Sequence, residues 1–234
     1  MERVRDDTVR LQLGWTEPLV VNAYVFDDGD GVTLVDTGMP VNRRSLRSEL
    51  AAAGYRPTDV ERVLLTHYDL DHVGGLTPLA RLLGGPLFDA EVYLGAEDVA
   101  LARGERDPPW LHHKGSFHRV AREVFDLDDV TLTPVDEGDR IGGFTAYHTP
   151  GHNPGHTAYV HDDGVAFVGD LLWETDGELT PPFWGDSYSM RELRASVRAF
   201  EGRAGAFEAL CPGHGVPFVR GGSDRLRSLA SRLG

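Results

Sequence analysis

The sequence has almost no cysteine and almost no lysine. Among its 234 residues there is one cysteine, Cys211, and one lysine, Lys114, so nearly every basic residue is an arginine. A single cysteine excludes an intramolecular disulfide. Cys211 ends the apolar segment 207–211, which predicts a buried structural thiol rather than a nucleophile. We interpret the scarcity of lysine as background composition and not as a functional signal.

Excess positive charge and long apolar runs are also missing. The formal net charge of −14 lacks the clustered positive charge that binding to phosphate backbones requires, so we expect no nucleic-acid partner. No apolar run approaches the ~18 residues needed to span a bilayer. The first seven residues lack the apolar core of a secretory signal. These absences predict a cytoplasmic protein without a membrane partner.

The remaining composition is that of a globular chain. Apolar residues make up 41% and charged residues 26%, which favours a single sizeable core over disorder. The apolar patterns predict strands at residues 18–27, 32–35, 60–66, 91–94, 130–134, 144–149, 157–160, 165–168 and 207–211. They predict helices at residues 41–53, 76–83, 190–200 and 223–233, and a short helix after the strand at 91–94.

Two segments, 104–115 and 175–189, are rich in proline, glycine and aromatic residues and are predicted to be irregular. No low-complexity linker and no short repeat divides the chain. We therefore expect residues 1–234 to form one domain, in which two sheets pack together with helices outside.

A cluster of possible metal ligands follows the apolar strand at 60–66. His67, Asp69, Asp71 and His72 fall within six residues, and such nitrogen and oxygen donors bind zinc, iron or manganese. The next glycines are expected to let the backbone turn tightly beside an ion. A solvated polar turn is the alternative. Further candidates follow later apolar segments, which favours the metal site: His148, His152, His156, Asp170 and His214.

Taken together, these motifs resemble the metallo-β-lactamase superfamily over residues 20–215. In order, the motifs are Val35-Asp36-Thr37-Gly38, Thr66-His67-x-Asp69-x-Asp71-His72-x-Gly-Gly, Thr149-Pro-Gly-His152, Gly169-Asp170 and Pro212-Gly-His214-Gly. The set is specific, although each turn alone would be weak. The resemblance implies an α/β (α+β) fold, a four-layer αββα sandwich, with the metals at one edge between the sheets.

The resemblance also implies a role for each motif residue. His67 and His152 would hold one metal ion with Asp69 beside them, and Asp170 would bridge to a second ion. That second ion would be held by Asp71, His72 and His214. Asp36 would orient the metal-binding loop from behind the ligands. The implied cofactor is two divalent metal ions, with zinc expected first and iron or manganese as alternatives. His148 and His156 match no ligand position and are interpreted as turn or supporting residues.

Asp69 departs from the family pattern, because most members carry histidine at that position. An additional carboxylate would weaken the Lewis acidity of the centre and favour iron or manganese. It is also similar to the flavo-diiron branch, which has glutamate there, although no flavodoxin-like domain follows. If Asp69 does not reach the ion, the first site would be weak and the enzyme would run on one metal.

The expected reaction is hydrolysis. In such a centre a metal-bridging hydroxide attacks the substrate, Asp71 shuttles a proton to the leaving group and Asp170 joins the two ions. The chain is similar to the compact quorum-quenching lactonases and small esterases, so we expect a small ester, lactone or thioester. The short segment after His214 disfavours a glyoxalase II-type enzyme. The alternatives are a non-haem iron protein that reacts with oxygen, a phosphodiesterase and a non-catalytic metal-binding scaffold.

Aromatic residues near the motifs are predicted to form a pocket for this small-molecule substrate. The candidates are Tyr68, Trp110, Trp173 and Trp184, with Phe183 and Tyr188 nearby. Trp173 stands where the lactonases often carry a tyrosine, but an indole offers only an N–H donor. The alternatives are that these aromatics cover the core or form a homodimer contact. His112, His113 and His118 are expected to be surface or loop residues.

Overall fold

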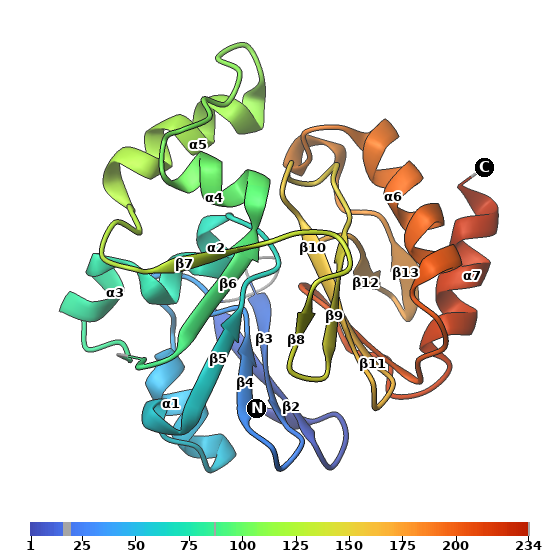
Figure 1. Cartoon of the computed structure of the whole chain (residues 1–234), viewed down its shortest axis with the longest axis horizontal. Coiled ribbons are helices and arrows are strands. Elements are labelled where there is room, and N and C mark those ends of the chain that lie inside the picture. The colour runs from blue at the N-terminus through green and yellow to red at the C-terminus, as the bar shows by residue number, and fades with distance from the viewer. Residues whose placement is uncertain (16–19, 87, 234) are drawn as a thin grey trace.

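The computed structural model describes residues 1–15, 20–86 and 88–233. Its first sheet has seven strands that lie side by side in chain order (Figure 1). They are β1 (Glu2–Arg3), β2 (Thr8–Gly14), β3 (Val20–Asp27), β4 (Val32–Val35), β5 (Val60–Leu64), β6 (Glu91–Gly95) and β7 (Leu132–Val135). Strands β1 to β4 pair antiparallel, and β4 to β7 pair parallel.

The second sheet is built from the later part of the chain. Its order is β14 (Ala209–Pro212), β11 (Val165–Gly169), β10 (Thr157–His161), β9 (Phe144–His148) and β8 (Arg140–Ile141). Only β14 pairs parallel, against β11. A small hairpin of β12 (Trp173–Thr175) and β13 (Glu178–Thr180) stands apart from both sheets.

Helices surround the two sheets. They are α1 (Leu46–Ala53), α2 (Leu70–Val73), α3 (Pro78–Leu82), α4 (Ala96–Ala102), α5 (His113–Val124), α6 (Met190–Arg203) and α7 (Gly222–Arg232). Three 3₁₀ turns add to them: η1 (Pro57–Asp59), η2 (Gly74–Leu76) and η3 (Trp184–Asp186). Figure 1 shows α1, α3 and α4 on the side of the first sheet and α6 and α7 on the side of the second. The predicted αββα sandwich is confirmed. Of the helices in the described ranges, none is long and apolar enough to cross a membrane.

Three apolar layers hold the sandwich together. In β3, Tyr24 and Phe26 point toward the second sheet, where they meet Phe144 and Phe167, whereas Val25 faces the helices. This alternation follows from the period of two along a strand. Both faces of the strands are buried, which explains why most of them appear in the sequence as nearly continuous apolar runs.

Some elements differ from the sequence prediction. The sequence predicts no strand at β1 or β2, although Val9, Leu11 and Leu13 alternate as a half-buried strand would. Helix α1 begins at Leu46 rather than at residue 41, because the Ser45 hydroxyl accepts the Ser48 N–H at 3.2 Å and caps the helix there. The segment 175–189, predicted to be irregular, contains β13 and η3. The first two residues of the strand predicted at 18–27 lie outside the described residues.

Helix α5 is the largest difference. The segment 104–115 is irregular as predicted up to His112, but a helix of twelve residues follows. The ring of His112 accepts the Gly115 N–H at 3.4 Å at the start of this helix. A Cβ at Gly115 would lie 2.5 Å from the carbonyl oxygen of Pro109, so the glycine permits the close approach of the preceding loop. Helix α5 carries two residues of the candidate metal centre, Lys114 and His118.

Candidate metal centre

Loops from both sheets bring the predicted ligands together. His67 follows β5 of the first sheet, whereas His152, Asp170 and His214 follow strands of the second. Two groups have ligand atoms that all lie within 4.8 Å of one another: His67, His152 and Asp170, and separately Asp71, His72 and His214. These are the groups that the resemblance implies for two ions. Their role as ligands stays a prediction.

Each of three histidines is held by its Nδ1 atom, so that Nε2 is left for the centre. Nδ1 of His72 lies 2.8 Å from Asp36 Oδ2, and Nδ1 of His214 lies 2.8 Å from the Val20 carbonyl oxygen. The Thr66 hydroxyl donates to Asp36 Oδ2, so its oxygen accepts from Nδ1 of His67 at 2.9 Å. In the neutral imidazoles, Nε2 then carries a lone pair, as metal binding requires.

Each of the two groups contains a buried ligand atom without a hydrogen bond in the described part of the chain. Among the described residues, His72 Nε2 and Asp170 Oδ1 are buried and form no hydrogen bond, and they lie 3.5 Å apart. Leaving such atoms unpaired is unfavourable unless a ligand satisfies them. Glycine at 213 keeps the space open, because a Cβ there would lie 2.1 Å from Asp170 Oδ1. These donors fit a divalent ion.

The carboxylates around the second group favour positive charge at the position between its ligand atoms. Burial opposes a charge on His72, but nearby carboxylates, led by Asp36, outweigh burial and raise the pKa of the imidazole to about 9. Burial likewise opposes a charge on Asp170, but His214 and His72 hold its pKa well below the usual value. Without an ion, protons on the histidines neutralise the carboxylates. An ion bound here would displace those protons.

The loop that carries His214 is fastened to β3. The Asn22 side chain donates to the carbonyl oxygens of Pro212 at 3.0 Å and Gly215 at 2.8 Å. The backbone N–H of Asn22 donates to Gly213 at 2.7 Å, and the hydroxyl of Tyr24 donates to Pro212 at 2.7 Å. One strand of the first sheet therefore positions a candidate ligand that follows a strand of the second.

Asp36 supports the centre from behind the ligands. Its Oδ1 accepts the Thr66 N–H at 2.8 Å, and its Oδ2 lies 2.8 Å from both the Thr66 hydroxyl and His72 Nδ1. The residue has a φ of 59°, a conformation that aspartate tolerates better than most residues. The geometry is the one expected for a residue that orients the metal-binding loop.

The glycines that follow His72 have a different role from the one predicted. Gly74 has ordinary helical angles, with φ −59° and ψ −29°, so no tight turn depends on it. Instead, a Cβ at Gly74 would lie 2.5 Å from the Pro40 nitrogen, and one at Gly75 would lie 2.5 Å from the Thr37 carbonyl oxygen. The two glycines allow the segment 37–40 to pack directly against the ligand-bearing helix α2.

Asp69 lies beside the first group, and both of its oxygens have protein partners. Oδ1 is 2.7 Å from His118 Nε2 and accepts the Asn153 side-chain N–H at 2.9 Å. Oδ2 is 2.7 Å from Lys114 Nζ and 3.0 Å from His152 Nε2. Burial opposes a charge on Asp69, but the charge of Lys114 holds its pKa well below the usual value.

Several residues at this site are missed by sequence reasoning. Lys114 and His118 are buried in the centre, so the expectation that His118 is a surface or loop residue is wrong. Asp98 accepts the N–H of Tyr68 at 2.8 Å and that of Gly155 at 2.6 Å, and so joins the two ligand loops. Burial raises the pKa of Asp98. The status of Lys114 as the sole lysine was the only sequence signal for any of them.

His156 and His148 hold turns. Nε2 of His156 accepts the Asp170 N–H at 3.1 Å, and Nδ1 lies 2.8 Å from the Thr149 hydroxyl. Burial holds the pKa of His156 well below its usual value, so the ring is neutral. His148 Nε2 lies 2.8 Å from the Pro154 carbonyl oxygen. Both histidines thus make the supporting contacts that the sequence predicts.

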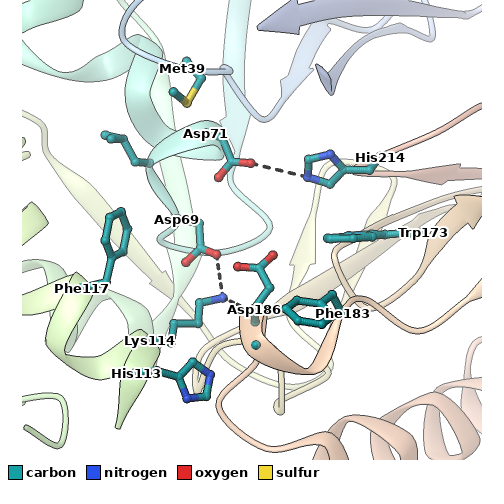
Figure 2. A pocket seen from close by; sticks show the side chains of 12 residues that line it. Met39, Asp69, Asp71, His113, Lys114, Phe117, Trp173, Phe183, Asp186 and His214 are labelled. Atoms are coloured by element: carbon teal, nitrogen blue, oxygen red, sulfur yellow. Dashed lines mark hydrogen bonds and ion pairs between the residues drawn. The ribbon is translucent and has the colours of Figure 1, made fainter. Parts of the chain in front are cut away.

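A cavity of about 750 Å³ opens onto the centre (Figure 2). Figure 2 shows Asp69, Asp71, Lys114 and His214 together, with Phe117 and Trp173 on opposite sides. The apolar part of the wall consists of Met39, Leu70, Phe117, Trp173 and Phe183. Small-molecule sites combine such apolar walls with a few polar groups.

Of the four aromatics predicted to line the pocket, Trp173 does so. Tyr68 packs into the core between the first sheet and its helices, and burial raises its pKa to about 12. Trp110 is 67% exposed and stacks against Arg119. Trp184 is 64% exposed and contacts Phe183 and His113 at the edge of the cavity. None of these three is among the lining residues of the cavity in the described structure. His113, expected on the surface, is among them.

Fold and site together define a metallo-hydrolase. The family model described as the metallo-beta-lactamase superfamily matches residues 16–214, and the chain belongs to that superfamily. It is 29% identical over 176 residues to the probable metallo-hydrolase YybB of Bacillus subtilis (strain 168), covering 74% of this chain and 71% of that protein.

A solved structure and a relative with a shorter match add detail. The crystal structure of TTHA1623 in a di-iron-bound form has a TM-score of 0.64 and 28% identity, covering 93% of this chain and 98% of that one. A hydroxyacylglutathione hydrolase of Aeromonas salmonicida (strain A449) is 30% identical over 118 residues, which is 49% of this chain and 34% of that enzyme.

Proposed function

We propose that this metal-dependent hydrolase cleaves a small ester, lactone or thioester that carries an apolar acyl group. The observation that carries the proposal is the pair of unsatisfied buried atoms, His72 Nε2 and Asp170 Oδ1, next to a cavity with largely apolar walls. Buried ligand atoms without hydrogen bonds favour the binding of an ion, and the apolar walls favour a substrate with an apolar group.

The chemistry needs no protein nucleophile. A divalent ion held by Asp71, His72, His214 and Asp170 would lower the pKa of water to about 7 and polarise a carbonyl oxygen. Asp71 is the carboxylate of this group that lines the cavity, and its side chain is 34% exposed. Burial opposes its charge, but His72 and His214 lower its pKa, so Asp71 is ionised at neutral pH and can accept a proton. We assign proton transfer to the leaving group to Asp71.

Two observations support this substrate class. The cavity wall contains five apolar side chains, which suits an acyl group better than a phosphodiester of a nucleic acid. One relative is named for the hydrolysis of an acylated glutathione. Zinc is our first choice of metal, and the di-iron form of the similar structure supports iron as the alternative.

An oxygen-reactive iron protein is the second candidate. It rests on Asp69, which stands at the motif position where we infer a histidine in most relatives. The contacts of Asp69 disfavour this candidate, because both carboxylate oxygens are engaged by protein groups.

The test is a substrate panel with metal removed and restored. Chelator-treated protein should be inactive on lactones, esters and thioesters, and zinc, manganese or iron should restore turnover of at least one of them. Asp170→Asn should lower turnover by at least about 100-fold, since it removes a charge from the centre. Asp30→Asn, in the exposed turn between β3 and β4, is the matched control and should be fully active.

Inactivity on the whole panel with every metal would refute the proposal. Turnover of phosphodiesters alone would replace it with a phosphodiesterase. Oxygen consumption by the iron-loaded protein with a reductant, without hydrolysis, would favour the second candidate.

A further inference from the structure

The only lysine of the chain ends inside the candidate metal centre. Lys114 is the second residue of α5 and is 5% exposed. Its Nζ lies 2.7 Å from Asp69 Oδ2, 2.8 Å from His152 Nε2 and 2.8 Å from the Asp186 carbonyl oxygen. Figure 2 shows the side chain reaching toward Asp69 from its helix. Lysine is rarely buried unless it is paired, so this arrangement requires an explanation.

Every hydrogen of the ammonium group has an acceptor. A lysine ammonium has three N–H donors, and the three contacts are a carboxylate, an imidazole nitrogen and a carbonyl oxygen. Because His152 Nε2 accepts from Lys114, its lone pair is already engaged. This is the atom with which His152 would bind the first ion.

The residues around Asp69 hold its carboxylate in place beside the ammonium of Lys114. His118 lies one helical turn after Lys114 on α5, so both side chains reach Asp69 from one face of the helix. Asn153 donates to the same oxygen as His118. The carboxylate is therefore oriented by a helix and a loop toward an ammonium, with no oxygen left unpaired.

The two halves of the centre differ in whether their ligand atoms already have protein partners. Toward the second group, His72 Nε2 and Asp170 Oδ1 lie 3.5 Å apart, and neither forms a hydrogen bond in the described part of the chain. In the first group, Nε2 of His67 lies 3.2 Å from His152 Nε2 and 3.4 Å from Asp69 Oδ2, beside the ammonium. The first half already contains an ammonium paired with its carboxylate, whereas His72 Nε2 and Asp170 Oδ1 have no hydrogen bond from any described protein group.

We propose that the ammonium of Lys114 takes the place of the first metal ion, so that the protein binds one divalent ion, at Asp71, His72, His214 and Asp170. With the metal-bound water neutral, one divalent ion and one ammonium balance the carboxylates of Asp69, Asp71 and Asp170. The catalytic meaning of the single ion rests on the proposed function, but the metal count does not.

The test is the number of tight metal equivalents per chain. Chelator-treated wild-type protein is titrated with Co²⁺ or Zn²⁺ and measured by calorimetry and by elemental analysis after gel filtration. We expect one equivalent in the wild type and two in Lys114→Met, which keeps the length of the side chain but frees Asp69 and His152. Arg119→Met is the matched control, since it removes a cation from the same helix outside the centre, and it should bind one equivalent.

Two tight equivalents in the wild type would overturn the proposal, and so would one equivalent in a folded Lys114→Met protein. If that variant does not fold, the wild type decides alone. Mn²⁺ at saturation should give the electron paramagnetic resonance spectrum of isolated ions, and spin-coupled pairs would refute the inference. A one-metal protein that hydrolyses nothing would refute the proposed function instead, and a two-metal hydrolase would refute only this inference.

Discussion

At the scale of single residues, the centre depends on side chains that never need to touch an ion. Asp36, Thr66 and Asp98 hold the backbone or the Nδ1 atoms of the ligand loops. Such contacts fix the orientation of an imidazole before the ion arrives, so they contribute to the affinity for the ion.

Asp36→Ala tests this dependence. We expect a loss of metal affinity of about 10- to 100-fold, because His72 loses the acceptor for its Nδ1 proton and Thr66 loses two contacts. Competition with a chromogenic chelator measures the affinity. Asp176→Ala is a matched control, because Asp176 also has a positive φ, 53°, but lies exposed in the turn between β12 and β13. Equal affinities of the two variants would contradict the expectation.

The sequence predicts the six residues of the two groups because each stands in a short motif after an apolar strand. It misses Lys114, His118 and Asn153 because their position depends on how α5 and the loop after β9 pack against Asp69. That packing involves residues far apart in the chain and leaves no local pattern. The structural interpretation of Cys211 agrees with its location, since burial in the layer between the sheets raises the pKa of the thiol.

At the scale of elements, helices with a clear apolar face are the ones that the sequence locates well. Helix α6 buries Leu193, Val197 and Phe200, at spacings of four and three residues. Helix α5 leaves Phe117 and Val120 exposed and carries polar residues on the face that enters the centre. Its sequence pattern is therefore typical of a solvated segment, although the segment forms a helix.

Phe200→Ala tests the contribution of α6. Phe200 is fully buried against the second sheet and packs on Tyr147 and Phe207, so we expect the free energy of unfolding to fall by about 3–5 kcal/mol. Denaturant unfolding measures the change. Arg194→Ala on the exposed face of the same helix should stay within about 0.5 kcal/mol of the wild type. A loss below about 1 kcal/mol for Phe200→Ala would show that α6 does not anchor the sheet.

At the scale of the whole molecule, the order of the motifs predicts the architecture better than the strand pattern does. The pattern alone misses β1, β2 and the short strands β8, β12 and β13, and it does not give the order of the strands in the two sheets. The resemblance implies two sheets between helices, and the separation of Phe144 and Phe167 into the central layer, away from Val168 and Phe200, agrees with it. The packing of both sheet faces also places most tyrosines in apolar surroundings.

Burial affects the ionisation of all seven tyrosines. It raises the pKa of each of them above 10, to about 12 for Tyr68 and Tyr93. The fold therefore prefers the neutral phenol. This contribution to stability is fully present below pH 10 and is lost as the pH rises through the folded values. In a pH titration, the tyrosinate absorbance of the native protein should increase at a higher pH than that of the denatured protein. It should then rise together with unfolding. Coincident titration curves for the native and denatured protein would contradict this.

The hydrogen bonds between β3 and the loop of His214 join residues almost two hundred positions apart. An ion at the second group would therefore bind only a chain in which β3 and the loop after β14 have already met. Early fragments of the protein, which still lack residue 214, would have no such affinity. Metal uptake thus becomes a late step that marks complete folding, and the bound ion would in turn oppose the separation of the two halves.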